Sequence, residues 1–207
     1  HVSGRASSSG DEAKVTELTN VLQILDLSGI PLKASERSAG APLGECPIVI
    51  GGGPCAYNPE PLAPFADLIA LGDGEEETIQ TIEVYKAWKK AGLPREEYLK
   101  MAAEIPGIYV PSLYEAAYHE DGTLASFSPV EEGVPKTVRK TIVCDFTKVT
   151  YPEAPVIPYL QAVQDRAVLE IQRGCIRGCR FCQAGMIYRP LRERSLDDLK
   201  QSAREML

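Results

Sequence analysis

Three cysteines lie close together near the C-terminal end of the sequence. Cys175, Cys179 and Cys182 are spaced C-x3-C-x2-C and fall within eight residues. No single helix or strand brings side chains at these spacings to one point, whereas a loop wrapped around a metal does. Thiolates select iron–sulfur clusters or zinc. The spacing therefore predicts a metal centre held by this loop.

The number of available ligands distinguishes between the two metals. A structural zinc site is closed by four ligands, but the nearest other cysteine, Cys144, lies 31 residues before Cys175, and the two histidines are His1 and His119. Three thiolates on a [4Fe–4S] cluster leave one iron open to a small molecule, which is a catalytic arrangement. The sequence favours the cluster, and a zinc knuckle completed by a distant ligand stays open as the alternative.

The residues between and beside the cysteines suit such a loop. Gly174 and Gly178 supply backbone freedom, and Arg173, Arg177 and Arg180 bring positive charge. These arginines can offset the negative charge of thiolates and cluster sulfides. The apolar run Ala167–Ile171 predicts a buried strand before the loop. A helix is predicted after it, beginning at the cap signal Ser195.

Glycine-containing segments follow two further predicted strands. Cys46–Ile50 ends in three glycines, and Asp67–Leu71 ends in a Gly-Asp-Gly segment that leads into an acidic helix start. Glycines at the carboxyl ends of strands let a ligand approach the backbone, so these positions are candidate cofactor contacts, although the acidic residues can equally cap the helix. The candidate glycines are Gly51, Gly52, Gly53, Gly72 and Gly74.

The rest of the pattern is that of an α/β protein. Helices are predicted from Val15 to Leu25, up to about Lys90, and over Arg95–Glu104, and Asp121-Gly122 predicts a β-hairpin between 107–119 and 123–130. Pro152, Pro155 and Pro158 predict a stiff connector. Residues 1–14 are polar and aperiodic, which predicts a disordered arm or a tag remnant.

Composition excludes several classes of protein. The chain has 207 residues, a net charge of −7, 44% hydrophobic and 25% charged residues, which are globular proportions. The acidic balance argues against a nucleic-acid surface without excluding a local basic patch. No apolar run reaches the roughly 18 residues of a membrane span, and no secretory signal is present. We therefore expect a cytoplasmic protein whose six cysteines are reduced or bind metal.

The segment EIQRGCIRGCRFCQAGMIYRPLRERS resembles the signature of the radical S-adenosylmethionine superfamily. The resemblance implies that Cys175, Cys179 and Cys182 hold a [4Fe–4S] cluster whose open iron chelates S-adenosylmethionine. Phe181 would then lie against the adenine. Reduction by a donor such as flavodoxin or ferredoxin would cleave S-adenosylmethionine to a 5′-deoxyadenosyl radical that acts on an unknown substrate.

Other segments resemble a narrower group. TNVLQILDLSGIPL, GGGPCAYNPEPLAPFAD and IPGIYVPSLYE are similar to uncharacterised B12-binding-domain radical S-adenosylmethionine proteins associated with a DUF2344 domain, which is then a candidate partner. The implied domains are a partial Rossmann-like, cobalamin-binding-type domain over 15–104, a hairpin-containing connector over 105–160, and the first βα unit of a TIM-type barrel over 161–207. The resemblance implies cobalamin as a candidate cofactor, but the cobalamin motif Asp-x-His-x-x-Gly is absent from this sequence, which favours a degenerate domain.

We expect the chain to be a truncated part of a longer enzyme and inactive alone, because the resemblance places the further S-adenosylmethionine contacts on later barrel strands. Two other functions stay open. One is a non-catalytic Rossmann-like module that binds a ligand or partner, with an inert cluster loop. The other is an interaction domain stabilised by zinc.

Overall fold

The computed structural model describes residues 10–38, 46–149, 159–160 and 168–206. The chain divides into two compact units, His1–Thr141 (unit 1) and Ile142–Leu207 (unit 2). The described residues form helices and small sheets, so the expected α/β class is confirmed at that level. The predicted proline connector lies outside the described residues.

Unit 1 contains a three-stranded sheet in the order β1 (Ile50–Gly51), β2 (Leu68–Ala70), β3 (Ile108–Tyr109). Strand β1 is parallel to β2, and β3 is antiparallel to it. The central strand is the apolar run predicted from the sequence, and Leu68 and Ile69 are fully buried. The strand predicted at Cys46–Ile50 begins instead at Ile50, because only Ile50 and Gly51 pair with β2.

Two helices of unit 1 agree with their predicted spans. Helix α3 (Gly74–Ala91) ends at Gly92, whose φ of 65° is the left-handed conformation favoured after a helix end. Helix α4 (Arg95–Ala103) follows it. The two helices meet at an aromatic cluster, in which the ring centroids of Trp88 and Tyr98 lie 5.2 Å apart. The aromatic cluster is part of a larger hydrophobic core, in which Leu99, Ala102 and Ile108 are also buried.

The N-terminal helix α1 (Gly10–Leu27) is longer than predicted. Residues 10–14 are helical, which corrects the expectation of a disordered arm over residues 1–14 for that part. The sequence Asp-Glu-Ala-Lys after Gly10 contains good helix formers, which explains the extension. The predicted stop is confirmed, because Gly29 has φ 67° and the amide of Ile30 donates to Leu25 O at 2.9 Å. A short helix, α2 (Ala34–Ser38), comes next.

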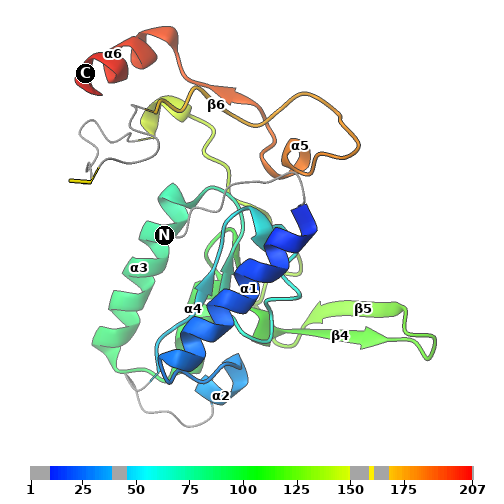
Figure 1. The fold of residues 1–207 in the computed structure, drawn as a ribbon. Coiled ribbons are helices and arrows are strands. Elements are labelled where there is room, and N and C mark those ends of the chain that lie inside the picture. The colour runs from blue at the N-terminus through cyan, green and yellow to red at the C-terminus, as the bar shows by residue number, and fades with distance from the viewer. Residues whose placement is uncertain (1–9, 39–45, 150–158, 161–167, 207) are drawn as a thin grey trace. The chain divides into compact units, whose positions relative to one another are not determined.

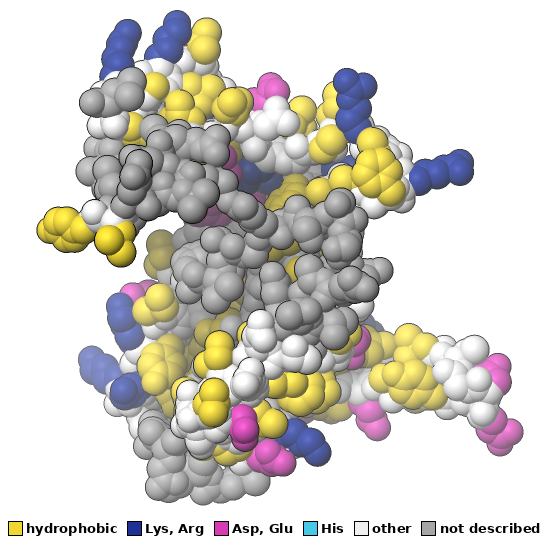
Figure 2. Space-filling view, in the orientation of Figure 1, with side chains coloured by type: hydrophobic (Ala, Val, Ile, Leu, Met, Phe, Trp, Pro, Cys, Tyr) yellow, Lys and Arg dark blue, Asp and Glu magenta, His cyan; other side chains and the backbone are white. Residues whose placement is uncertain are grey.

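The predicted hairpin is confirmed as strands β4 (Tyr114–Tyr118) and β5 (Leu124–Pro129). It extends from the body of unit 1 (Figure 1). Tyr114 and Phe127 stack with centroids 5.4 Å apart, and hydrophobic side chains line the hairpin up to an acidic tip (Figure 2). Two 3₁₀ turns, Pro54–Tyr57 and Pro111–Leu113, connect other elements of this unit.

Unit 2 contains the 3₁₀ turn Phe146–Lys148, strands β6 (Gln172–Arg173) and β7 (Arg192–Glu193), the short helix α5 (Ala184–Ile187) and the terminal helix α6 (Leu196–Met206). The prediction of a buried strand over Ala167–Ile171 is wrong for its described part. Val168 and Ile171 are 65% and 59% exposed, and the strand begins only after Ile171, at Gln172, where it pairs antiparallel with β7. The helix predicted after Ser195 is confirmed: the Ser195 hydroxyl accepts from the Asp198 amide at 3.1 Å.

Among the helices within the described ranges, none is both long and apolar enough to cross a membrane. The Rossmann-like topology of unit 1 and the first barrel unit in unit 2 stay predictions.

Candidate metal centre

The cysteine loop of unit 2 begins and ends on a pair of short strands. Gln172 faces Glu193 and Arg173 faces Arg192 across the β6–β7 ladder. Directly after β6, Gly174 has φ 92°, and a Cβ there would lie 2.5 Å from Pro190 O and 2.7 Å from Tyr188 O. Only glycine permits this close approach of the start of the loop to its end. The ladder and Gly174 therefore close the loop of residues 174–191 at its base.

The three cysteines in this loop carry free thiols. Cys175 and Cys182 are half-buried and Cys179 is exposed. The amide of Arg177 donates to Cys175 Sγ at 3.3 Å, and the amide of Cys182 donates to Cys179 O at 3.1 Å. These two amides fix the backbone of the loop around Cys175 and Cys179.

The donor set fits a [4Fe–4S] cluster by its chemistry, because such clusters are held by cysteine thiolates. In the conformation described here, no group of three or more His, Cys, Asp or Glu side chains among the described residues is arranged to hold a metal ion. Binding of a cluster would therefore require the three thiols to move closer together. The loop that carries them is short, and its two ends are already held together at the base.

Phe181, predicted to contact adenine, has 92% of its surface exposed. It lies between Cys179 and Cys182 in the sequence, and its ring is available to stack on a flat ligand. Its contact with S-adenosylmethionine stays a prediction.

The arginines near the loop divide into two groups. Arg177 and Arg180 are exposed, so their charges can serve the loop as predicted. Arg192 is buried and donates to Val143 O at 3.1 Å and Pro190 O at 3.2 Å. Arg173 and Arg194 lie over the Phe146 ring. These contacts give Arg173, Arg192 and Arg194 structural roles within unit 2.

Gly72 contributes to the packing of unit 1. Gly72 has φ 118°, and a Cβ there would overlap Thr141 O and lie 2.5 Å from Thr141 N. Thr141 forms a parallel bridge with Gly72, and its amide donates to Leu71 O at 2.9 Å. The chain's own backbone thus occupies the space that a ligand was predicted to use. The described residues therefore do not fit a cobalamin seated against Gly72.

The other candidate glycines have separate surroundings. Built Cβ atoms at Gly51 and Gly52 would meet Ile69 and Ala70 at ordinary contact distances. One at Gly74 would lie 3.3 Å from Thr78 Oγ1, whereas Gly53 faces open space. Their contacts with a cofactor stay predictions.

A buried carboxylate stands beside Thr141. Glu77 is 3% exposed, and its Oε2 accepts from Thr141 Oγ1 at 3.3 Å. Burial raises the pKa of this carboxyl, while the hydrogen bond from Thr141 lowers it by less. The acidic helix start thus contributes one buried residue, which the sequence pattern did not distinguish from its neighbours.

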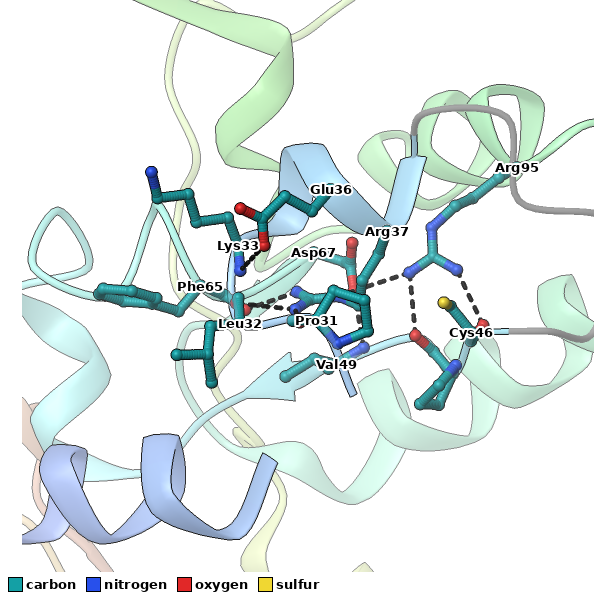
Figure 3. Close-up of polar contacts among 11 residues, drawn as sticks. Pro31, Leu32, Lys33, Glu36, Arg37, Cys46, Val49, Phe65, Asp67 and Arg95 are labelled. Carbon is teal, nitrogen blue, oxygen red and sulfur yellow. Dashed lines mark hydrogen bonds and ion pairs between the residues drawn. The ribbon is translucent and has the colours of Figure 1, made fainter. Parts of the chain in front are cut away.

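A buried ionic network was missed by the sequence reading. Asp67 Oδ2 lies 3.2 Å from Arg37 Nε and 2.8 Å from Arg95 Nη2, as Figure 3 shows. It also accepts from the Val49 amide at 2.8 Å. In the sequence, Asp67 is distinguished only as the first residue of an apolar run. No local pattern links it to Arg37, 30 residues before it, or to Arg95, 28 residues after it.

Residues 15–111 match the family described as radical SAM proteins, N-terminal. The match covers slightly less than half of the chain. An uncharacterized protein of Methanocaldococcus jannaschii is 28% identical over 159 residues, which are 76% of this chain and 28% of that protein. The chain therefore spans little more than a quarter of the relative's length. No solved structure matches the chain significantly.

Proposed function

We propose that the protein is the N-terminal part of a radical S-adenosylmethionine enzyme in which Cys175, Cys179 and Cys182 hold a [4Fe–4S] cluster. The observation that carries the proposal is the set of three free thiols in one loop that β6, β7 and Gly174 close at its base. The match of residues 15–111 to the N-terminal region of radical SAM proteins supports it independently. When bound, the cluster supplies the electron that cleaves S-adenosylmethionine reductively to a 5′-deoxyadenosyl radical.

The residues of the loop have distinct tasks in this proposal. The Arg177 amide fixes the position of the Cys175 sulfur through its hydrogen bond to Sγ. The exposed guanidinium groups of Arg177 and Arg180 offset the negative charge of the loaded site. The exposed ring of Phe181 stacks on the adenine of S-adenosylmethionine.

The wider organisation is part of the same proposal. Unit 1 is a Rossmann-like domain that works without cobalamin, since Thr141 occupies the space at Gly72. Unit 2 begins the catalytic barrel. The chemistry needs an electron donor such as flavodoxin or ferredoxin, and a DUF2344 domain is the proposed partner.

Electron paramagnetic resonance of the anaerobically reconstituted, dithionite-reduced protein tests the proposal. We expect a [4Fe–4S]⁺ spectrum that changes when S-adenosylmethionine is added, because the ligand binds at the open iron. S-adenosylhomocysteine at the same concentration separates binding from cleavage. A spectrum that S-adenosylmethionine leaves unchanged contradicts the proposed function. A protein with one zinc and no iron favours the interaction domain instead.

A further inference from the structure

Two arginines of unit 2 share one aromatic ring. The Cζ atoms of Arg173 and Arg194 each lie 5.0 Å from the centroid of the Phe146 ring. Phe146 is 3% exposed, so the ring is withdrawn from water. Guanidinium groups at this distance from an aromatic face are attracted by its quadrupole, more strongly when the site is desolvated. We refer to these three residues as the Arg–Phe–Arg cluster.

Polar contacts fix each member of the Arg–Phe–Arg cluster. Arg173 forms two hydrogen bonds with the Glu170 carboxylate, at 2.7 Å and 3.1 Å. Arg194 donates to Val149 O at 3.1 Å. Phe146 begins a 3₁₀ turn that Asp145 caps by accepting from the Thr147 amide at 3.2 Å. The cluster thus joins the segment 145–149 to both sides of the ladder.

The Arg–Phe–Arg cluster is located at the base of the cysteine loop. Arg173 is the last residue of β6 and directly precedes Gly174. Arg194 directly follows β7, and its amide donates to Ile171 O at 3.0 Å. One residue on each side of the loop therefore contacts the same ring. A two-stranded ladder this short is marginal by itself, so the ring adds the contacts that keep the two ends together.

We infer that Phe146, through Arg173 and Arg194, is a positioning residue for the cysteine loop. The inference rests on the proposed function, because its consequence is that the cluster is retained. With the two ends of the loop fixed, gathering three thiols around a cluster costs less conformational entropy. Arg194 also places a permanent positive charge at the base of a loop that becomes negative when it is loaded, whereas Glu170 offsets the charge of Arg173.

The substitution Phe146→Leu tests this inference, with Phe146→Tyr as the rescue variant. Leucine fills most of the space but removes the aromatic face, whereas tyrosine retains it. Because neighbours of metal ligands typically affect metal affinity 10- to 100-fold, we expect iron loss to a chelator to become about tenfold faster in Phe146→Leu and to return to the wild-type rate in Phe146→Tyr. Phe127→Leu, the same change on the hairpin of unit 1, serves as the matched control.

A second readout does not depend on the cluster. Alkylation of the metal-free protein, followed by mass spectrometry, gives the reaction rate of each thiol. We expect Phe146→Leu to change the rates at Cys175, Cys179 and Cys182, while the exposed Cys55 of unit 1 reacts as before. Unchanged rates together with unchanged iron retention overturn the inference and leave the proposed function standing. If the wild-type protein takes up no iron, the proposed function fails, and the alkylation rates still decide whether Phe146 positions the loop.

The substitution Arg194→Lys tests the inference if Phe146→Leu does not fold. Arg194→Lys keeps the charge but loses the planar group that covers the ring and donates to Val149 O. We expect it to release iron faster than the wild type. Wild-type iron retention in a folded Arg194→Lys protein overturns the inference.

Discussion

Arg37 Nε lies 3.2 Å from Asp67 Oδ2 in the interior of unit 1, and both side chains are fully buried. Arg37 also donates to the carbonyl oxygens of Pro31 and Leu32, at 2.6 Å and 2.9 Å, and to Phe65 O at 2.5 Å. The pair therefore fixes the segment around α2 to the start of β2. The charge of Arg37 is tolerated inside the protein because nearly every donor on its guanidinium has an acceptor.

Loss of the carboxylate is expected to destabilise unit 1 strongly. Asp67→Ala leaves the buried Arg37 and the nearly buried Arg95 without a counter-charge, and breaking a buried pair in this way costs about 3–5 kcal/mol. The free energy of unfolding can be followed in urea by the fluorescence of Trp88, the single tryptophan, which is 5% exposed in the core.

An exposed ion pair of the same unit provides the control. Glu83 and Lys86 are 2.7 Å apart, but their side chains are 63% and 64% exposed. Solvent screens such a pair, so Glu83→Gln should leave the unfolding midpoint almost unchanged. Equal effects of Asp67→Ala and Glu83→Gln would show that the Asp67 network does not stabilise unit 1.

The buried Glu77 predicts a dependence of stability on pH. Burial raises the pKa of Glu77 in the folded protein above its ordinary value of 4.5. The folded state therefore holds this proton more tightly than the unfolded state does. The contribution is fully favourable below pH 4.5 and is lost as the pH rises through the higher folded pKa. Glu77→Gln should abolish this fall in stability, as measured by urea unfolding across that pH range.

The neighbouring Glu76 supplies the comparison for that experiment. Glu76 is exposed on the same turn of α3, so Glu76→Gln should retain the wild-type pH profile. A Glu77→Gln profile identical to that of Glu76→Gln would contradict the assigned effect of burial.

The close approach of Thr141 to Gly72 predicts different results at two glycines. Both Gly72 and Gly53 have positive φ, but a Cβ at Gly72 meets the backbone of Thr141 whereas one at Gly53 meets nothing within 4 Å. Gly53→Ala should cost only the strain of its backbone conformation, φ 90° and ψ −177°, which is about 1–3 kcal/mol. Gly72→Ala should cost clearly more, since the bridge to Thr141 must also move. Equal unfolding midpoints for the two variants would contradict the described packing.

Sequence periodicity and turn residues predicted the elements that local patterns determine. Helices α3 and α4 agree with their predicted spans, and the Asp121-Gly122 turn lies between β4 and β5. In that turn the Asp121 carboxylate accepts from the Thr123 amide at 2.9 Å, a contact made within three residues. Such local interactions leave a signature that can be recognised in the sequence.

Features that depend on distant contacts were not predictable in this way. The apolar run before the cysteines was interpreted as a buried strand, but strand pairing with β7 fixes the ladder at Gln172 and Arg173 instead. The close approach of Thr141 to Gly72, 69 residues earlier in the chain, leaves no signature in the local sequence. The cysteine spacing predicted the loop, but Phe146, which contacts both sides of its base, carries no motif.

Iron analysis of a cysteine series tests the central claim most directly. After anaerobic reconstitution and gel filtration, the wild type and the variants Cys55→Ser and Cys144→Ser should each retain about four irons and four sulfides per chain, as one cubane cluster requires. Single serine variants of Cys175, Cys179 and Cys182 should each lose most of this iron. Equal iron in all variants, or loss in Cys144→Ser comparable to that in Cys175→Ser, would contradict a cluster held by the three loop cysteines.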